Sequence, residues 1–247
     1  MWFRPALWPT IIAGISLIIL VTLGTWQLQR LAWKNSLIER VSAQSNLPSE
    51  ALPTQSEWPV LDLAETEYKP VSAWGTFDHG AEIHVFTSLG EPKGAQGGPG
   101  FLVFTPLSLE TGGTVYINRG FVPETYKMPE SRSENLPIGQ VEIEGLFRAS
   151  QTPGYFVPAP DDQANIWYSR DVVAMARAAN IADPATFYID AYADEAHLLP
   201  QGGETRVEFR NSHFDYAMTW YGLAVVLLGF YLAYHKSTGR IGPPRRS

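Results

Sequence analysis

The residues best suited to chemistry stand where a long apolar segment begins near the C-terminus. The run Arg210-Asn211-Ser212-His213 leads into this segment, and Asp215 follows closely. We expect a helix capped by Asn211 or Ser212, with Asp215 returning a hydrogen bond as in a capping box. His213 then lies in the first turn, where the positive end of the helix dipole disfavours a cationic imidazole, although Asp215 acts in the opposite direction. A neutral imidazole can ligate a metal.

The residues that share a helical face with His213 are small or flat. At 100° per residue, Ala217, Trp220 and Ala224 fall on the same face as His213. Two alanines and a tryptophan around an imidazole leave room for a flat ligand. His213 and Trp220 are therefore candidate ligand-binding residues.

A second group of candidates lies on the first apolar segment. Trp26, Arg30 and Trp33 fall within about 60° of each other on a helix. A guanidinium between aromatic rings suits a carboxylate such as a haem propionate. The alternative is an aromatic belt with a snorkelling arginine at a membrane surface, and spacing alone favours this alternative.

Other residues that could carry chemistry have simpler explanations. His79 and His84 lack an evident third ligand, so they are predicted to be ordinary turn and strand histidines. The net charge of −7 argues against nucleic acid as a partner, and the absence of cysteine excludes thiolate sites. No GxSxG or HExxH motif supports hydrolysis. A flexible loop is predicted for the glycine cluster Gly94, Gly97, Gly98 and Gly100.

Two apolar segments position these candidates. No charged residue lies between Arg4 and Arg30, or between Asp215 and Lys236. A membrane-spanning helix needs about 20 apolar residues. We expect one span at 10–29 and a second, with its entrance, at 211–235. A cleaved signal peptide is disfavoured for the first segment, because the run is long and a Trp- and Arg-containing helix continues beyond it.

Charge placement predicts the orientation. All 25 acidic residues lie between Glu39 and Asp215, whereas the ends 1–9 and 236–247 are purely basic. Short basic ends belong in the cytoplasm, so the central segment is expected on the non-cytoplasmic side. Arg30, Lys34 and Arg40 flank the first span on the wrong side for this rule.

The central segment is predicted to contain a helical extension and connector at 30–66 and a β-rich domain at 67–210. The turn Glu110–Gly113 predicts a hairpin, and Asp171–Asn180 predicts one short helix. The fold class is therefore two transmembrane helices flanking an α+β, mainly antiparallel β domain, as an open barrel or sandwich. Strands are expected at 70–77, 81–89, 100–109, 114–122, 140–150, 186–192 and 205–210.

Motifs spread along the whole chain resemble those of the Surfeit locus protein 1 family. They run in order from the first span to the second: Leu23-Gly24-Thr25-Trp26-Gln27 with Arg30 and Trp33-Lys34, Gly75-Thr76-Phe77-Asp78, Asn118-Arg119-Gly120-Phe121-Val122-Pro123, Trp167-Tyr168-Ser169-Arg170-Asp171, Gly203-Glu204-Thr205-Arg206, Arg210-Asn211-Ser212-His213 and Thr219-Trp220-Tyr221-Gly222.

The resemblance implies a cytochrome c oxidase assembly factor that has no catalytic turnover of its own. Such a protein acts when haem a is placed into oxidase subunit I, with haem a synthase as a second candidate partner. His213 matches the histidine proposed as the haem a ligand in bacterial members. Helical spacing adds Trp26, Arg30 and Trp220 as the other candidate haem-binding residues. We expect a bacterial inner-membrane protein, because no transit sequence precedes the first span. No further domain follows the second span, which argues against a sensor kinase.

Two alternatives belong to other functional classes. One is an interaction scaffold that stabilises nascent subunit I and never binds haem, and a haem spectrum of the purified protein would separate the two. The other is a periplasmic enzyme on a membrane hairpin. The sequence disfavours this alternative, because no nucleophile–base set is evident.

The charge distribution makes a prediction about topology. A reporter that is active only outside the cytoplasm is expected to be active when inserted near Gly94 and silent when fused after Arg246. The physical reason is the attraction of the basic ends to the cytoplasmic side. The reverse pattern of activity would overturn this orientation.

Overall fold

The structure is a computed structural model that describes residues 2–194, 198–205 and 211–242. The chain divides into two compact units. One contains Met1–Arg40 with Glu208–Ser247, and the other contains Val41–Val207.

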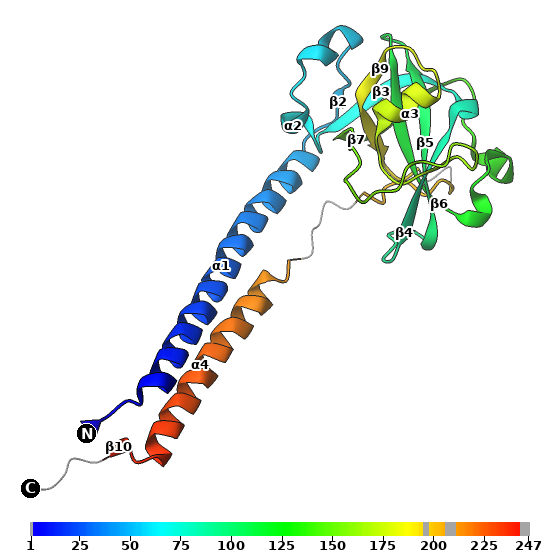
Figure 1. Cartoon of the computed structure of the whole chain (residues 1–247). Coiled ribbons are helices and arrows are strands. Elements are labelled where there is room, and N and C mark those ends of the chain that lie inside the picture. Colours follow the sequence, from blue (N-terminus) through cyan, green and yellow to red (C-terminus); the bar gives the residue numbers. More distant parts are fainter. Residues whose placement is uncertain (1, 195–197, 206–210, 243–247) are drawn as a thin grey trace, which may run out of the picture. The chain divides into compact units, whose positions relative to one another are not determined.

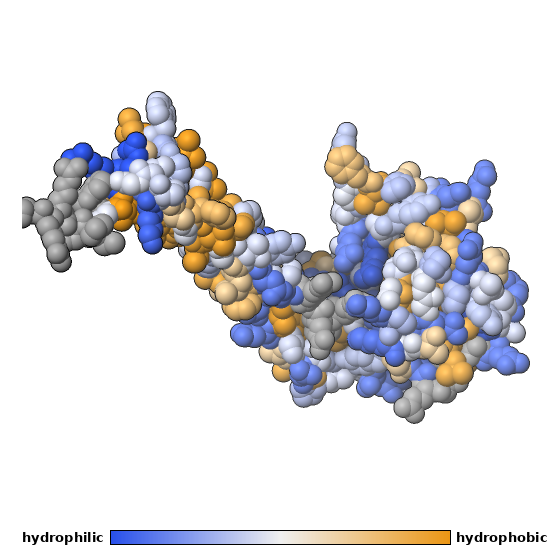
Figure 2. Space-filling view, turned by 90° about the horizontal axis from the view of Figure 1, so that it is seen from below, coloured by the Kyte–Doolittle hydropathy of each residue, from blue (hydrophilic) through white to orange (hydrophobic). Residues whose placement is uncertain are grey.

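The first unit is a pair of long helices, α1 (Leu7–Ser45) and α4 (His213–Ser237), which lie side by side (Figure 1). Both are long and apolar enough to cross a membrane, which agrees with the two predicted spans. The short strands β1 (Trp2–Phe3) and β10 (Ile241–Gly242) pair antiparallel at one end of the helix pair. Much of the helix surface in view is hydrophobic, whereas the surface of the second unit mixes hydrophilic and hydrophobic residues (Figure 2).

The second unit is built mainly from strands, with short helices between them. The predicted hairpin is confirmed, because its turn joins β5 to β6. The short helix α3 begins after Asp171, whose carboxylate accepts a hydrogen bond from the Ala174 N–H. In chain order the elements are β2 (Glu50–Ala51), η1 (Gln55–Val60), α2 (Leu63–Thr66), β3 (Pro70–Phe77), η2 (His79–Ala81), β4 (Ile83–Leu89), β5 (Gly98–Leu109), β6 (Thr114–Pro123), η3 (Glu124–Tyr126), η4 (Pro129–Asn135), β7 (Gln140–Ala149), β8 (Ile166–Trp167), α3 (Val172–Ala178) and β9 (Pro184–Ala191).

The strands form a closed barrel. Their order is β2-β3-β7-β9-β6-β5-β4-β8, and an additional pairing of β3 with β5 closes the ring. Gly75 makes this closure possible because it pairs with Val141 on β7 and Leu109 on β5, and a Cβ there would clash with the carbonyl oxygen of Ser108. Most pairings are antiparallel, as predicted, but β2 with β3, β4 with β8 and β6 with β9 run parallel.

The core of the barrel consists of aromatic and branched aliphatic side chains. The rings of Phe147 and Phe187 stack with 4.4 Å between their centroids, and Phe104 meets Tyr188 edge to face. A second cluster places α3 against the barrel through Val172 and Met175, both fully buried. Burial of these side chains, at about 25 cal/mol per Å², stabilises the unit.

The connector before the barrel is more ordered than the sequence predicts. Its prolines suggest an extended chain, but it contains η1, which includes Pro59, and the helix α2, which is capped by Asp62. The indole of Trp58 meets the ring of Phe187 at 5.4 Å, so burial of this side chain fixes the connector on the barrel. The expected last strand, 205–210, lies outside the described residues except for Thr205, which is not in a strand.

The motif Asn118-Arg119-Gly120 has a structural explanation. Asn118 donates a hydrogen bond to Asp190 on β9 and accepts one from the Gly120 N–H. Gly120 has φ +119°, and a Cβ at this position would clash with the carbonyl oxygen of Gln201. The backbone N–H and C=O groups of Gln201 both form hydrogen bonds with the backbone of Phe121. Only glycine at position 120 therefore permits this close approach of the segment that follows β9.

A buried charged network joins β4 to η4. The Glu82 carboxylate accepts hydrogen bonds from His84 Nε2, at 2.8 Å, and from the Arg132 guanidinium. Burial raises the pKa of Glu82, but the hydrogen bond from His84 and the charge of Arg132 outweigh it and hold the pKa below the ordinary 4.5. His84 is therefore the strand histidine that the sequence predicts. His79 lies in η2 and its Nε2 is 2.8 Å from the Pro137 carbonyl oxygen.

Removal of the guanidinium tests this network. Arg132→Met leaves Glu82 buried without its cation, and we expect the free energy of unfolding to fall by about 3–5 kcal/mol. Because the pKa of Glu82 is lowered in the folded state, its contribution is present at neutral pH and is lost as pH falls below about 4.5. Thermal unfolding at pH 7 and pH 4 measures both effects. The control Arg177→Met removes an exposed cation and should change the stability by less than about 0.5 kcal/mol; equal Tm values for the two variants would contradict the assignment.

Candidate functional site

The candidate site depends on how closely α4 packs against α1. Ala217 is 1% exposed and Ala224 is 5% exposed. Gly24 on α1 lies against the ring of Tyr221, and an added Cβ would be 2.9 Å from that ring. Helix α1 therefore fills the space beside Ala217 and Ala224 in which the sequence predicts a flat ligand. A ligand of His213 has to lie beside the interface between α1 and α4, here named the seam.

Hydrogen bonds along the seam fix the register of the two helices. Thr25 Oγ1 is 3.1 Å from Tyr221 OH, and Asn211 Nδ2 donates to Asn35 Oδ1 at 2.8 Å. At the opposite end, the Ala6 N–H donates to the Nε2 of His235, which is fully buried. The helices are therefore antiparallel, and each polar bond within an apolar surrounding contributes roughly 1 kcal/mol.

His213 is the first residue of α4, and its side chain reaches α1. Its Nδ1 is 2.7 Å from Oε1 of Gln27. Among the described residues, its Nε2 has no hydrogen-bond partner. The predicted position of the helix start is confirmed, because Ser212 is the N-cap residue, but the predicted capping box is wrong. Ser212 has φ −99° and ψ 8°, which keeps its hydroxyl away from the first-turn N–H groups, and Asn211 Oδ1 accepts from the His213 N–H instead, at 3.4 Å.

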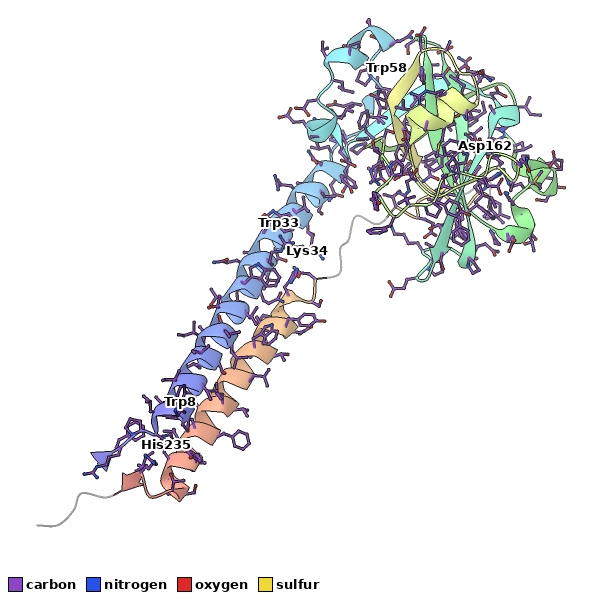
Figure 3. The ribbon with its side chains drawn as sticks, viewed as in Figure 1. Trp8, Trp33, Lys34, Trp58, Asp162 and His235 are labelled. Carbon is purple, nitrogen blue, oxygen red and sulfur yellow. The ribbon has the colours of Figure 1, made fainter. Side chains whose placement is uncertain are left out.

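Of the aromatic and basic candidates, the structure brings two into direct contact. The guanidinium carbon of Arg30 lies 4.7 Å from the ring centroid of Trp33. Trp26 is 49% exposed and Trp33 is 52% exposed, whereas Trp220 on α4 is partly buried. Figure 3 shows Trp33 on the stretch of α1 that lies beside the start of α4. No described hydrogen bond joins Arg30 to His213.

This donor set fits a haem better than a bare metal ion. Within the described residues, no group of three His, Cys, Asp or Glu side chains is gathered for a metal. A haem iron needs only an axial ligand from the protein, and a histidine nitrogen is a common one. The Nε2 of His213 supplies such a nitrogen, while exposed aromatic rings and the Arg30 guanidinium lie on the same helix pair.

Gln27 is the site residue that the sequence reasoning missed as a candidate. The sequence contains a signal for Gln27, because an amide within an apolar span is costly in a membrane unless it is hydrogen-bonded. Gly24, Gln27 and Leu31 also share one helical face, and all three are buried or partly buried.

The barrel offers a second candidate site around Arg119. This side chain lies 5.1 Å from the ring centroid of Phe77, and burial lowers its pKa to about 10. It lines a cavity of about 430 Å³ together with Glu142, Glu144 and Asp194. One cation and three carboxylates suit a polar binding surface.

Comparison with known proteins gives a consistent result. The SURF1 family model matches residues 14–225, a segment that includes both Gln27 and His213. Surfeit locus protein 1 of Mus musculus is 37% identical over 212 residues, which cover 81% of this chain and 67% of the relative. The Homo sapiens protein is 36% identical over 214 residues, with 82% and 69% covered. A SURF1-like protein of Monosiga brevicollis is 33% identical over 240 residues, with 91% and 88% covered. The chain belongs to the SURF1 family.

Proposed function

We propose that this protein assists the assembly of cytochrome c oxidase by holding haem a transiently at His213 while the haem is inserted into subunit I. Membership of the SURF1 family, whose members are known as cytochrome oxidase assembly factors, supports the assembly role. The observation that carries haem binding is the imidazole of His213, which is bonded through Nδ1 and leaves Nε2 without a partner among the described residues.

Different side chains around His213 would contact different parts of a haem. A bound haem would supply the iron, and His213 Nε2 would supply one nitrogen ligand to it. Trp26 and Trp220 would offer aromatic surfaces to the porphyrin, and Arg30 would pair with a propionate. A single protein ligand beside half-exposed rings suits temporary storage, because few contacts have to break when the haem leaves.

The proposed location is the inner membrane of a bacterium, with the barrel in the periplasm. The two apolar helices and the confinement of all 25 acidic residues to Glu39–Asp215 support a membrane hairpin of this orientation. The proposed partners are oxidase subunit I and, upstream of it, haem a synthase.

A second candidate function is a scaffold that stabilises nascent subunit I without binding haem. The burial of Ala217 and Ala224 favours it, because packing against α1 already accounts for the small residues on the His213 face. The half-exposed Trp26 and Trp33 are then an aromatic belt at the membrane surface.

The haem content of the unaltered protein separates the two functions, and substitution of His213 tests the ligand. His213→Ala is expected to remove bound haem a while the protein still accumulates in the membrane. Arg30→Ala should weaken retention less, because one charge-assisted contact contributes about 1.5–3 kcal/mol and water partly replaces it. The measurement is the absorption spectrum and extracted pigment of protein purified from cells that make haem a. His79→Ala, in the barrel unit, is the control. Full retention of pigment in His213→Ala would reject His213 as the ligand, whereas absence of haem a from the unaltered protein would favour the scaffold.

Deletion of the gene tests the assembly role itself. An insertion helper accelerates a step that continues slowly without it, so deleted cells should contain oxidase subunit I with partial haem a occupancy and reduced activity. The measurement is the ratio of haem a to subunit I in membranes. A complete absence of haem a would indicate a role in biosynthesis instead, and a normal ratio with normal oxidase activity would reject the connection to the oxidase.

A further inference from the structure

The structure contains one hydrogen bond that acts directly on the proposed haem ligand. Gln27 on α1 reaches His213 across the seam, with 2.7 Å between Oε1 and Nδ1. We propose that Gln27 is the positioning residue of the haem ligand: its amide oxygen keeps the imidazole proton on Nδ1 and thereby presents the lone pair of Nε2 to the iron of haem a. This inference rests on the proposed haem-binding function.

The chemistry of the two groups determines the tautomer. A neutral imidazole carries one proton, and only the nitrogen without a proton can bind iron. An amide oxygen accepts hydrogen bonds and cannot donate them, so the nitrogen beside Oε1 carries the proton. The proton is therefore on Nδ1 of His213, and Nε2 has a free lone pair. The same bond fixes the rotation of the ring, as the outer partners of metal-bound histidines do.

The surroundings of Gln27 keep its amide in place. Gly24, one turn earlier on α1, lies against Tyr221, and Thr25 Oγ1 is 3.1 Å from the hydroxyl of the same tyrosine. These contacts fix the distance and register between the helices at the point where Gln27 meets His213. Gln27 is partly buried, whereas Gln29, two residues later on α1, is exposed. The chain therefore contains a matched glutamine for comparison.

An amide also sets the strength of the iron–nitrogen bond. A carboxylate accepts the Nδ1 proton more strongly than an amide and makes the imidazole a more basic ligand. Glutamine at this position orients the ring and leaves the ligand moderately basic, which suits a protein that has to release its haem. Glutamate at position 27 is expected to preserve the orientation and to hold the haem more tightly.

Three variants of the full chain, purified in detergent, test the inference by titration with haem a. Gln27→Leu retains the size of the side chain but removes the acceptor, and the affinity should fall by about 10–100-fold. Gln27→Glu should retain haem a, with a lowered reduction potential and a shifted absorption band, because its ligand is more basic. Gln29→Leu, the control, should match the unaltered protein in affinity and spectrum.

A double variant distinguishes positioning from helix packing. If Gln27 acts through His213, Gln27→Leu should leave unchanged whatever residual haem a affinity the His213→Ala protein retains in the same titration. Wild-type affinity and spectrum in Gln27→Leu, with loss of haem in His213→Ala, would overturn the inference and leave the proposed function intact. Loss of haem in both Gln27→Leu and Gln27→Glu would show that Gln27 does not act as an acceptor. Retention of haem in His213→Ala would reject the proposed function and the inference together.

Discussion

The close approach of α1 and α4 is the constraint that positions the candidate site. Gly24 has no Cβ, and the ring of Tyr221 occupies the space that a larger residue would fill. Because the helices approach closely at this point, the Thr25 hydroxyl and the Gln27 amide reach partners on α4. Van der Waals packing and polar bonds drive helix association in lipid, where burial of apolar surface gives no advantage. The position of His213 is therefore a consequence of one glycine and a few polar side chains.

In the barrel unit, too, glycines permit another part of the chain to approach closely. Gly75 allows β3 to pair with two strands, and Gly120 admits the backbone of Gln201. Both glycines act by letting another part of the backbone approach. They shape the barrel, whereas Gly24 in the helix pair lets α4 approach α1 beside His213.

The helix pair contains the residues that are proposed to hold a haem. The Nδ1 of His213 is bonded to Gln27, and the rings of Trp26 and Trp33 are half exposed. A haem bound there would be held by one coordinate bond and surface contacts. The barrel contributes a buried network in which the Glu82 carboxylate accepts a hydrogen bond from His84 and pairs with the charge of Arg132, and these contacts stabilise the fold.

The sequence by itself determined the elements with strong local signals. Long uncharged runs identified both apolar helices, alternation and turn residues identified the strands from β3 to β7 and β9, and Asp171 marked the start of α3. These signals are visible because hydrophobic period and capping act within a few residues along the chain. His213 was recognised as a candidate from its place in a helix start and from family resemblance.

Only the tertiary structure decided which residues meet. Barrel closure requires β3 to pair with β5 and β7 at once, and the parallel pairing of β6 with β9 joins segments far apart in sequence. The capping box failed because Ser212 adopts a backbone conformation that its local sequence does not impose. The two alanines near His213 proved to admit α1 rather than a ligand, and Gln27 became a site residue through a bond that spans almost the whole chain. Such contacts depend on the distance and rotation between helices, which packing determines and local sequence patterns do not encode.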